Sequence, residues 1–588
     1  MILQALYDYY QRKKDDSDSN IAPFGMERKE IPFIIVIDEE GNFLRLEERN
    51  EGNGKDKLSH RFLVLRSKTR SGCNSWANAC VFWDNYGYLL GIAKASAKKK
   101  ESDMPKAIEY ARKQNITFRK TVSQYCQQFP ENKQFRAVKI FYQKEQNMEL
   151  LKNDPLWETI TKKDGTCLSF RLVKEDKLVA EHEDLIPKPL IKEGEKEGIC
   201  LITGERAPIC ILHTRQMIPG GGSNSTIVAF QKNSGFDSYG KEQGLNAPIS
   251  IEAESAYSTA LKELLDKNSH NKFKMGEITF LFWAQRKCKF EKDFSLFFNS
   301  TSKDDPDRNI QAIRALMQSP YKGKVSDQEE TKFYLLGLSP NVTRISVRSW
   351  REGTVKDFAN KIRLHFEDLR ITKGTKEERE YFSLFHLLTQ IAFQYKIDKL
   401  PPNMVSDVLN SVLNGTPYPT TLQLHCINRI RVDHSISYIR AAILKAYLNR
   451  KIRFNNNLNK PITMALDKEN TNQAYLCGRL FATLEKIQEE AAPGLNASIK
   501  DQYYSSASAT PVAVFPRLLA LKNHHTPKLN PGRAVNMERL IGEIMSSMEA
   551  NGFPCHLSLD DQSRFAIGYY HQRNDFFSSK ENNNESKL

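Results

Sequence analysis

The sequence lacks several features that would assign it to a familiar class of protein. No apolar run approaches the ~20 residues that a helix needs to span a bilayer, and the amino terminus lacks a signal peptide's order of basic, apolar and small residues. The motifs HExxH and GxSxG, the P-loop lysine and a His–Asp doublet suited to a metal-dependent nuclease are also absent. We therefore expect a cytoplasmic protein that is not an enzyme.

Cysteine pairs with the spacing of a zinc motif are absent as well. The ten cysteines are scattered, and those nearest to a metal-binding spacing are the pair Cys73/Cys80 and the group Cys200, Cys210 and His213. A metal site and buried thiols in a reducing cytoplasm both account for this group, and the missing CxxC repeats favour thiols. We predict no metal and no other cofactor.

The chain carries a large excess of positive charge. Its 588 residues include 86 Lys and Arg against 71 Asp and Glu, which gives a net charge of +15. Such an excess favours a polyanionic partner, either nucleic acid or an anionic membrane surface, and the absences above favour nucleic acid. The length exceeds what one hydrophobic core supports, so two to four domains are expected.

The order of predicted elements indicates a multi-domain α+β fold. Apolar runs that flank the turn Asp38–Asn42 predict a hairpin, and a helix is predicted over residues 2–13. We expect a mixed α/β amino-terminal body with small antiparallel sheets, followed by an all-α carboxy-terminal bundle. The predicted domains are a basic α/β domain (1–198), a central α/β domain with a glycine-rich loop (199–375), a helical connector (376–463) and a helical bundle (464–588).

The last of these domains differs from the rest in charge. From Met464 onward the chain has 13 Lys and Arg and 14 Asp and Glu, and the asparagine-rich segment 455–459 precedes it. Leucines at helical spacing predict a helix near 475–491, and Ser558 with Asp561 predicts the cap of a final helix. These features favour a separable unit, for which Met464 is an internal translation start. The alternative is that Met464 simply leads into the next helix.

A glycine-rich stretch, residues 215–246, dominates the middle of the chain. Six of its 32 residues are glycine, and 12 of the other 26 are Ser, Asn, Gln or Lys, which suit phosphates and base edges. Its apolar run 227–230 is expected to form a buried strand. The stretch is either a long surface loop or a nucleic-acid contact, and in the second case its DNA-reading residues are Gln231, Lys232 and Asn233.

A second candidate loop runs from Arg66 to Asn78. It interleaves amides with cations between a predicted strand and the apolar segment 81–83, a pattern typical either of a solvated turn or of a rigidly held groove contact. For the second reading we assign phosphate contacts to Lys68 and Arg70. The residues assigned to base edges are Asn74, Ser75 and Asn78.

Other cations form smaller groups. The lysines and arginines Lys98, Lys99, Lys100, Arg286 and Lys287 are candidate contacts to backbone phosphates. Phe282 or Trp283 would serve as an aromatic platform beside the last two. A predicted strand places Arg344, Ser346, Arg348 and Trp350 on one face, opposite Ile345 and Val347. That face receives either a nucleic-acid backbone or acidic neighbours.

Several segments, in the same order along the chain, carry a resemblance to a known family. They are MILQALYDYY (1–10), EIPFIIVIDEEGNFL (30–44), VFWDNYGYLLG (81–91), CLITGE (200–205), DSYGKEQGLNAPIS (237–250), FYLLGLSPNVTRISVRSW (333–350), CGRLFATLEKIQEEA (477–491) and FAIGYYHQ (565–572). The chain resembles the large subunit of the type I-C CRISPR surveillance complex, also called Cascade. The matching segments run over nearly the whole chain.

The resemblance implies a non-catalytic DNA-binding subunit. Such a subunit reads a protospacer-adjacent motif in double-stranded DNA, promotes R-loop formation, holds the displaced strand and recruits a separate helicase-nuclease. Under this resemblance we assign the displaced strand to the five cations Lys98, Lys99, Lys100, Arg286 and Lys287. The implied partners are the guide RNA, the target DNA, the backbone and guide-processing subunits, and a small subunit made from the same gene. Two alternatives stay open: a metal-dependent nuclease acting on the same DNA, and a structural scaffold that binds guide RNA without reading DNA.

Overall fold

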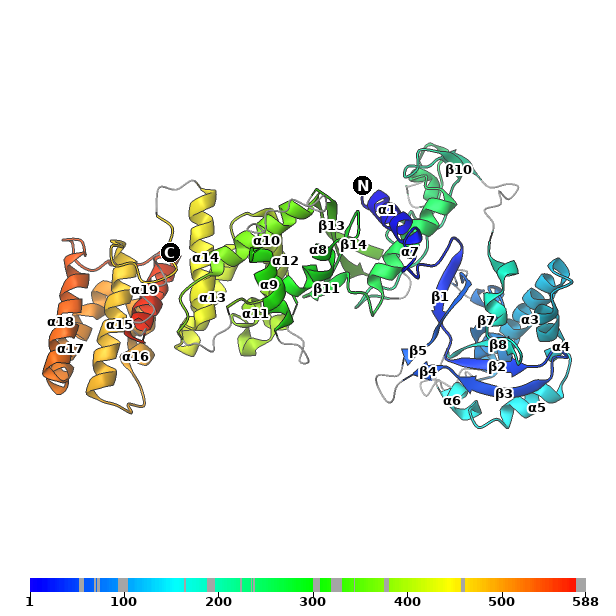
Figure 1. The fold of residues 1–588 in the computed structure, drawn as a ribbon, viewed down its shortest axis with the longest axis horizontal. Coiled ribbons are helices and arrows are strands. Elements are labelled where there is room, and N and C mark those ends of the chain that lie inside the picture. The colour runs from blue at the N-terminus through cyan, green and yellow to red at the C-terminus, as the bar shows by residue number, and fades with distance from the viewer. Residues whose placement is uncertain are drawn as a thin grey trace. The chain divides into compact units, whose positions relative to one another are not determined.

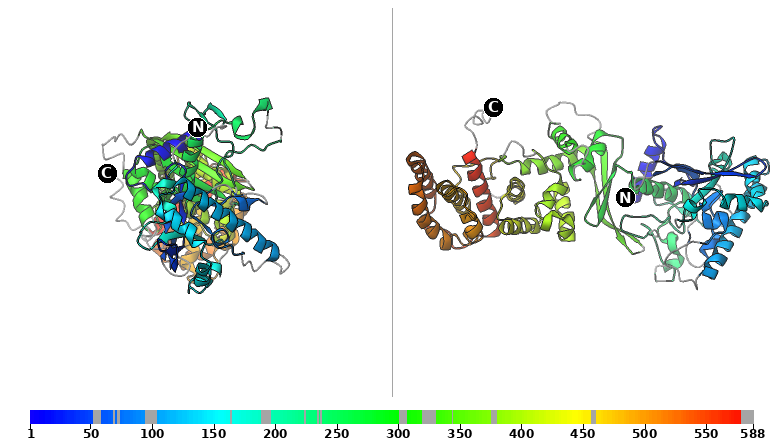
Figure 2. Two further views of the ribbon diagram at one scale, coloured as in Figure 1. Left: turned by 90° about the vertical axis from the view of Figure 1, so that its right-hand side faces the viewer. Right: turned by 90° about the horizontal axis from the view of Figure 1, so that it is seen from below.

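The chain forms two compact units, which we describe from a computed structural model (Figure 1, Figure 2). The structure describes residues 1–51, 58–67, 70, 74–93, 104–162, 165–187, 196–222, 225–233, 235, 238–299, 307–318, 330–342, 344–374, 380–455 and 460–577. Unit 1 comprises Met1–Asp266 and Pro340–Ser346, and unit 2 comprises Lys267–Ser339 and Val347–Leu588. This division is coarser than the four predicted domains, whose individual boundaries stay a prediction.

Unit 1 is built on a four-stranded sheet with the order β3-β2-β8-β7. Its strands are β3 (Phe43–Glu48), β2 (Phe33–Ile37), β8 (Cys167–Leu172) and β7 (Trp83–Asn85). The predicted hairpin is confirmed, because β2 pairs antiparallel with β3. β2 also pairs parallel with β8, so this sheet is mixed rather than purely antiparallel. All five residues of β2 are buried, as expected for a central strand of apolar residues.

Helices and short ladders complete unit 1. Its described helices are α1 (Ile2–Lys14), α2 (Tyr86–Leu90), α3 (Met104–Gln128), α4 (Lys133–Phe141), α5 (Gln146–Lys152), α6 (Trp157–Lys162) and α7 (Ile251–Leu265). The ladders pair β1 (Met26–Glu30) with β6 (Arg61–Leu65), β4 (Asn50–Glu51) with β5 (Leu58–Ser59), and β9 (Glu197–Ile199) with β10 (Arg206–Pro208). Helix α1, predicted over 2–13, packs on α7.

Unit 2 begins with a second four-stranded sheet, β11-β12-β13-β14. Its strands are β11 (Lys272–Met275), β12 (Ile278–Ala284), β13 (Lys332–Asn341) and β14 (Arg344–Thr354). Phe280 and Phe282 of β12 and Phe333 of β13 belong to the core that the unit's helices share. The end of β13 and the start of β14 are assigned to unit 1.

The rest of unit 2 is helical. Its described helices are α8 (Lys289–Asp293), α9 (Arg308–Gln318), α10 (Val355–Leu369), α11 (Leu384–Thr389), α12 (Pro402–Asn414), α13 (Thr420–Asp433), α14 (Tyr438–Phe454), α15 (Gln473–Ala491), α16 (Ile499–Ala507), α17 (Pro511–His525), α18 (Pro531–Ser546) and α19 (Leu559–Phe577). The predicted α+β fold, with a mixed α/β amino-terminal part and a helical carboxy-terminal part, is confirmed. Among the described residues, none of the helices combines the length and apolarity that crossing a bilayer requires.

Helices α15 and α19 cross at very short range. A Cβ atom added to Gly478 would lie 2.0 Å from the carbonyl oxygen of Phe565, and one added to Gly568 would lie 2.2 Å from the carbonyl oxygen of Tyr475. Glycine on both helices therefore lets the two backbones touch. The carboxy-terminal bundle is organised around this crossing.

The carboxy-terminal bundle shares one core with the helices before it. Helix α19 packs on α14 as well as on α15. The Nζ atom of Lys451 on α14 lies 2.7 Å from the Oδ2 atom of Asp560 on α19, and the hydroxyl of Tyr570 donates to the backbone oxygen of Thr372 at 2.8 Å. If residues 464–588 are also made alone, that product exposes a face that the full chain covers.

Candidate nucleic-acid interface

The loop from Arg66 to Asn78 is fixed at its start by contacts to α7 and β1. The Nη1 atom of Arg66 donates to the hydroxyl of Ser258 at 3.1 Å, and Nη2 donates to the hydroxyl of Thr259. The backbone N–H of Ser67 donates to the carboxylate of Glu27 at 3.0 Å. The loop therefore leaves the scaffold from a defined position.

Arg70 fixes the loop a second time. Its Nη1 atom donates to Oδ1 of Asp84 at 2.9 Å, its Nη2 atom pairs with Oδ2, and its Nε atom donates to the backbone oxygen of Asn78 at 2.6 Å. The guanidinium carbon also lies 4.0 Å from the ring centroid of Tyr88. Burial alone would lower the pKa of Arg70, but the hydrogen bonds and charge of Asp84 raise it above its ordinary value. This geometry favours a structural role over the predicted phosphate contact.

Arg70 and Asp84 thus hold the far end of the loop. Asp84 is only 1 % exposed, and it also accepts a hydrogen bond from the backbone N–H of Cys80 at 3.0 Å. Lys68, the other predicted phosphate contact, lies outside the described residues.

The three predicted base-reading residues are placed differently. Asn74 is exposed, and its side chain does not cap the short helix Ser75–Ala77. Ser75 is half-buried, and its hydroxyl is bonded to that of Tyr110 on α3. Asn78 is half-buried and uses its backbone oxygen to accept from Arg70. Of the three, Asn74 is the best placed to reach a base edge.

The glycine-rich stretch presents the other predicted reading residues. Gln231, Lys232 and Asn233 are all exposed, and Lys232 lies 3.1 Å from the carboxylate of Glu242. Their role in reading DNA stays a prediction. The expectation of a buried strand over 227–230 is wrong. These residues form no strand, and each is half-buried or exposed.

The same stretch holds an aromatic residue that the sequence reasoning missed. Tyr239 is 100 % exposed and has a φ of 57°, in the left-handed region that a bulky side chain rarely occupies. Such outliers cluster at functional sites. An aromatic residue inside a polar glycine-rich loop was the signal that could have identified it.

The structure describes only two of the five cations that we assigned to the displaced strand. Arg286 and Lys287 are exposed just after β12, whereas Lys98, Lys99 and Lys100 lie outside the described residues. The platform assigned to Phe282 or Trp283 is wrong. Both side chains are 0 % exposed, since both faces of β12 are covered, and neither can stack on a base.

The predicted basic face of β14 is not uniform. Arg344 is exposed and lies in unit 1, while Arg348 lies in unit 2 and donates from Nε to the hydroxyl of Ser339 at 2.7 Å. Trp350 is half-buried and stacks on Tyr334, with ring centroids 5.7 Å apart. On the opposite parity Ile345 is buried, as predicted, but Val347 is exposed.

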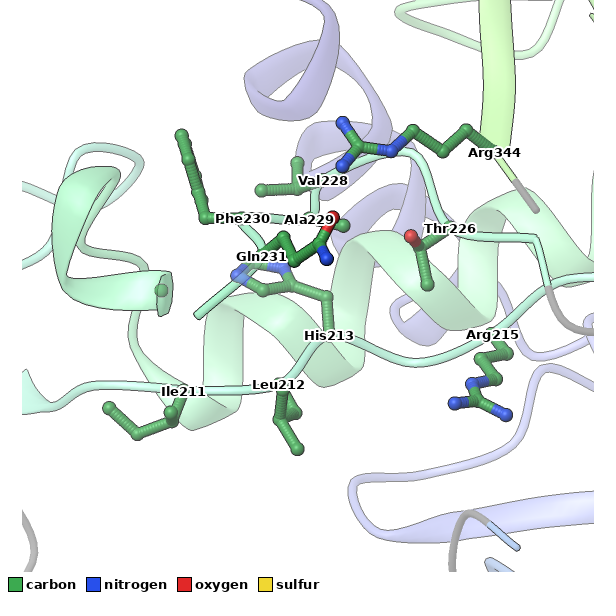
Figure 3. A pocket seen from close by; sticks show the side chains of 11 residues that line it. Ile211, Leu212, His213, Arg215, Thr226, Val228, Ala229, Phe230, Gln231 and Arg344 are labelled. Carbon is green, nitrogen blue, oxygen red and sulfur yellow. The ribbon is translucent and has the colours of Figure 1, made fainter. Parts of the chain in front are cut away.

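Arg344 also lines a pocket within unit 1 that sequence reasoning did not anticipate (Figure 3). The pocket has a volume of about 240 Å³ and is lined by Ile211, Leu212, His213, Arg215, Thr226, Val228, Ala229, Phe230, Gln231, Gly244 and Arg344. His213 is 7 % exposed, and its Nδ1 atom is bonded to the hydroxyl of Tyr257. Its Nε2 atom is buried and has no hydrogen-bond partner among the described residues. Burial lowers the pKa of His213, although the charge of Glu254 opposes this.

Of the residues near metal spacing, Cys73 lies outside the described residues, and Cys200, Cys210 and His213 each have separate partners. The Sγ atom of Cys200 accepts from the backbone N–H of Ser250 at 3.2 Å, and that of Cys210 donates to the backbone oxygen of Leu212 at 3.3 Å. Burial raises the pKa of Cys200, but hydrogen bonds from Ser250 and Thr203 outweigh it and lower the pKa to about 7. Within the described ranges, no three His, Cys, Asp or Glu side chains are grouped so that they could hold a metal ion.

Met464 lies in the connection between α14 and α15, well before the first residue of α15, Gln473. Its side chain is exposed, and its backbone oxygen accepts from the backbone N–H of Thr372 at 2.9 Å. Met464 is therefore not the residue that leads directly into the helix. The internal start stays a prediction.

The chain matches a known protein family over nearly its whole length. A family model with the description CRISPR-associated protein (Cas_Csd1) matches residues 6–577. No curated protein matches the chain. The family match spans both compact units and includes every candidate residue described above.

Proposed function

Because the chain belongs to the family of CRISPR-associated proteins described as Cas_Csd1, we propose that it is the non-catalytic large subunit of a type I-C surveillance complex. In this role it recognises a short protospacer-adjacent motif in double-stranded DNA and promotes R-loop formation. It then holds the displaced strand and recruits a separate helicase-nuclease. Pairing with the guide RNA supplies the longer sequence recognition.

The observation that carries this proposal is the doubly fixed loop between Arg66 and Asn78. A loop that presents an exposed amide, Asn74, from a rigid scaffold is suited to read a base edge, because direct readout needs donors and acceptors at fixed positions. The contacts of Arg66 with α7 and of Arg70 with Asp84 and with the backbone of Asn78 fix described residues on both sides of Asn74. The net charge of +15 supplies the affinity for phosphates that is independent of sequence.

Tyr239 is the residue that we assign to opening the duplex. Proteins that distort DNA insert apolar side chains between base steps, and a fully exposed aromatic ring on a polar loop has the required reach. Arg286 and Lys287, both exposed, are assigned to the backbone of the displaced strand. No platform from β12 takes part, since Phe282 and Trp283 are buried.

The test of motif reading is a binding experiment with the purified complex. Duplexes that carry the motif or a scrambled motif are compared for the wild type, Asn74→Ala and Asn78→Ala. Loss of a base-reading amide costs about 1–3 kcal/mol and relaxes discrimination at one base pair. The matched control is Asn153→Ala, an exposed asparagine at the end of α5. Unchanged affinity and unchanged motif preference in both variants would show that this loop does not read DNA.

Two further measurements separate the alternatives. Incubation of the purified chain with labelled DNA and Mg²⁺ or Mn²⁺ should give no cleavage, and specific cleavage would establish a nuclease. A complex that binds target DNA equally well with and without the motif would be a guide-RNA scaffold instead.

Strand opening is tested at Tyr239. Permanganate footprinting of thymines in the target should show less unpaired DNA for Tyr239→Ala, while Tyr239→Phe keeps the ring and should keep the wild-type pattern. An unchanged footprint in Tyr239→Ala would remove Tyr239 from this role.

A further inference from the structure

The pocket in unit 1 combines cationic, polar and aromatic groups that the motif-reading proposal does not use. Of the eleven lining residues two are arginines and none is acidic. Phe230 adds an aromatic ring, and Gln231 and Thr226 add an amide and a hydroxyl (Figure 3). This composition suits an anionic ligand that also has a flat polar ring.

His213 has a buried ring nitrogen, Nε2, without a hydrogen-bond partner in the described part of the chain. Burial raises the pKa of Tyr257, with the charge of Glu254 adding to the effect, so its hydroxyl keeps its proton and can donate to Nδ1 of His213. The neutral imidazole then carries its proton on Nε2. A buried donor left unpaired destabilises a fold, and His213 is one of the residues that line the pocket. A ligand oxygen or ring nitrogen would satisfy it.

Arg344 provides an uncommitted charge. Among the described residues its guanidinium forms no ion pair or hydrogen bond, although the backbone beside it is fixed, because the N–H of Ile345 donates to the backbone oxygen of Thr226 at 3.1 Å. Figure 3 shows Arg344 reaching in from the strand β14. Guanidinium groups bind phosphate through paired hydrogen bonds.

The volume limits the size of the ligand. Pockets for drug-sized ligands span about 300–1,000 Å³, so a pocket of about 240 Å³ suits one nucleotide rather than a run of stacked bases. Single bases taken out of a strand are usually held by an aromatic ring and by hydrogen bonds to the base edge. Phe230 and Gln231, which are neighbours in the chain, provide both.

We propose that this pocket holds a single unstacked nucleotide, with its phosphate at Arg344 and its base against Phe230, where Gln231 and His213 contact the base edge. The inference rests on the proposed nucleic-acid-binding function and adds a site to it. The nucleotide comes either from a strand of the target DNA or from the guide RNA, and the test has one arm for each.

The experiment is a photocrosslinking scan with the assembled complex. 5-Iodouracil replaces one base at a time, first through the motif and the adjoining target strands, then through the unpaired parts of the guide RNA. The expected result is a crosslink to peptide 226–231 from one nucleotide position in one of the two arms. Crosslinks of similar strength from three or more successive positions would indicate an open groove and overturn the proposal. So would the absence of any crosslink to this peptide in both arms.

Affinity measurements show whether the crosslinked nucleotide is bound in the pocket or only lies close to it. Phe230→Leu and Arg344→Ala should each weaken binding of the nucleic acid that crosslinks by about tenfold, a typical effect of losing one base-stacking or phosphate contact. An abasic nucleotide at the crosslinking position should weaken wild-type binding similarly but should add little in Phe230→Leu. The matched control is Arg206→Ala, an exposed arginine paired with Glu197. Additive effects of the abasic site and Phe230→Leu would overturn the proposal.

The two proposals fail in distinguishable ways. Motif-dependent duplex binding in the same wild-type complexes tests the proposed function alone. If that dependence is present and the pocket peptide does not crosslink, only the pocket assignment fails. If the dependence is absent, the proposed function fails, and the guide-RNA arm decides the pocket by itself.

Discussion

Replacing Asp84 with asparagine would show whether Arg70 supports the loop or holds a phosphate. Asp84 is almost fully buried and accepts two hydrogen bonds from the Arg70 guanidinium, with further bonds from the backbone N–H groups of Cys80 and Asn85. Asparagine has nearly the same shape but no charge, so Asp84→Asn breaks the ion pair and leaves Arg70 in place.

The expected loss of stability follows from the burial of the pair. Removing one partner of a buried ion pair costs about 3–5 kcal/mol. The Arg70 side chain is 25 % exposed and regains some hydration, so we expect the lower end of that range, about 3 kcal/mol. For domains of about 150–250 residues, a loss of 1 kcal/mol in stability lowers the melting temperature by about 2–4 °C. A loss of about 3 kcal/mol in unit 1 should therefore lower its melting temperature by about 6–12 °C.

The decisive assay is motif-dependent binding, because the two possible roles of Arg70 predict different binding results for Asp84→Asn. Asp84→Asn removes a negative charge from a protein that we propose binds DNA, so if Arg70 holds a phosphate, the affinity for DNA should stay unchanged or rise. If Arg70 instead anchors the loop, Asp84→Asn should lose motif discrimination to the same extent as Arg70→Ala. Asp176→Asn, an exposed aspartate in the same unit, controls for the change of charge alone.

Retention of discrimination would refute this reasoning. If Asp84→Asn melts within about 2 °C of the wild type and still prefers the motif, while Arg70→Ala loses that preference, then Arg70 acts at the DNA. The shift of 2 °C corresponds to less than about 1 kcal/mol, which is too little for a broken buried pair.

Three further predictions concern unit 2. Gly478→Ala should destabilise the chain by about 3 kcal/mol or more in urea denaturation, because the added Cβ atom meets the backbone of α19. The control Gly542→Ala, on the exposed side of α18, should stabilise the chain by about 0.5–1 kcal/mol. Equal effects of the two substitutions would contradict the close crossing of α15 and α19. The pKa of His571 is lowered to about 3, first by burial and then by the charge of Lys445, so between pH ~6.5 and 3 the unfolded chain binds a proton that the folded chain does not. The free energy of unfolding should therefore fall as pH decreases across this window, by about 1.4 kcal/mol per pH unit from this group, and a wild-type slope in His571→Gln would count against that origin. A carboxy-terminal tag should reveal a 125-residue product that begins at Met464 and vanishes in Met464→Ala; a short band that survives the substitution, or no short band in the wild type, rejects the internal start.

Local patterns in the sequence predicted the elements of the fold well. The apolar runs around the turn Asp38–Asn42 specify the β2–β3 hairpin, because alternation and turn residues act over a few positions. The predicted final helix is confirmed as α19, where the N–H of Asp561 donates to the hydroxyl of Ser558 at 3.2 Å. The periodic leucines near 475–491 are confirmed as α15.

Pairings between distant segments could not be predicted in the same way. β2 pairs parallel with β8, more than a hundred residues later, and nothing in either strand specifies that partner. Trp283 lies in an apolar run typical of a buried strand, and it is buried in β12, so the platform role assigned to it conflicted with the local pattern itself. For the candidate site too, contacts between distant segments could not be predicted from the sequence. Exposed Asn74 and Gln231 follow from composition, whereas a pocket that joins His213 to Arg344 depends on segments that meet only in three dimensions.

The discontinuity of the two units has a genetic consequence. The chain passes between them three times, after Asp266, after Ser339 and after Ser346, so neither unit is encoded by one uninterrupted stretch of gene. Gene fission at codon 266 would leave the first product without the segment 340–346, and with it the buried Ile345 and the pocket residue Arg344. A shorter product that starts inside this gene is therefore more readily a folded protein when it starts at codon 464 than when it starts at codon 267.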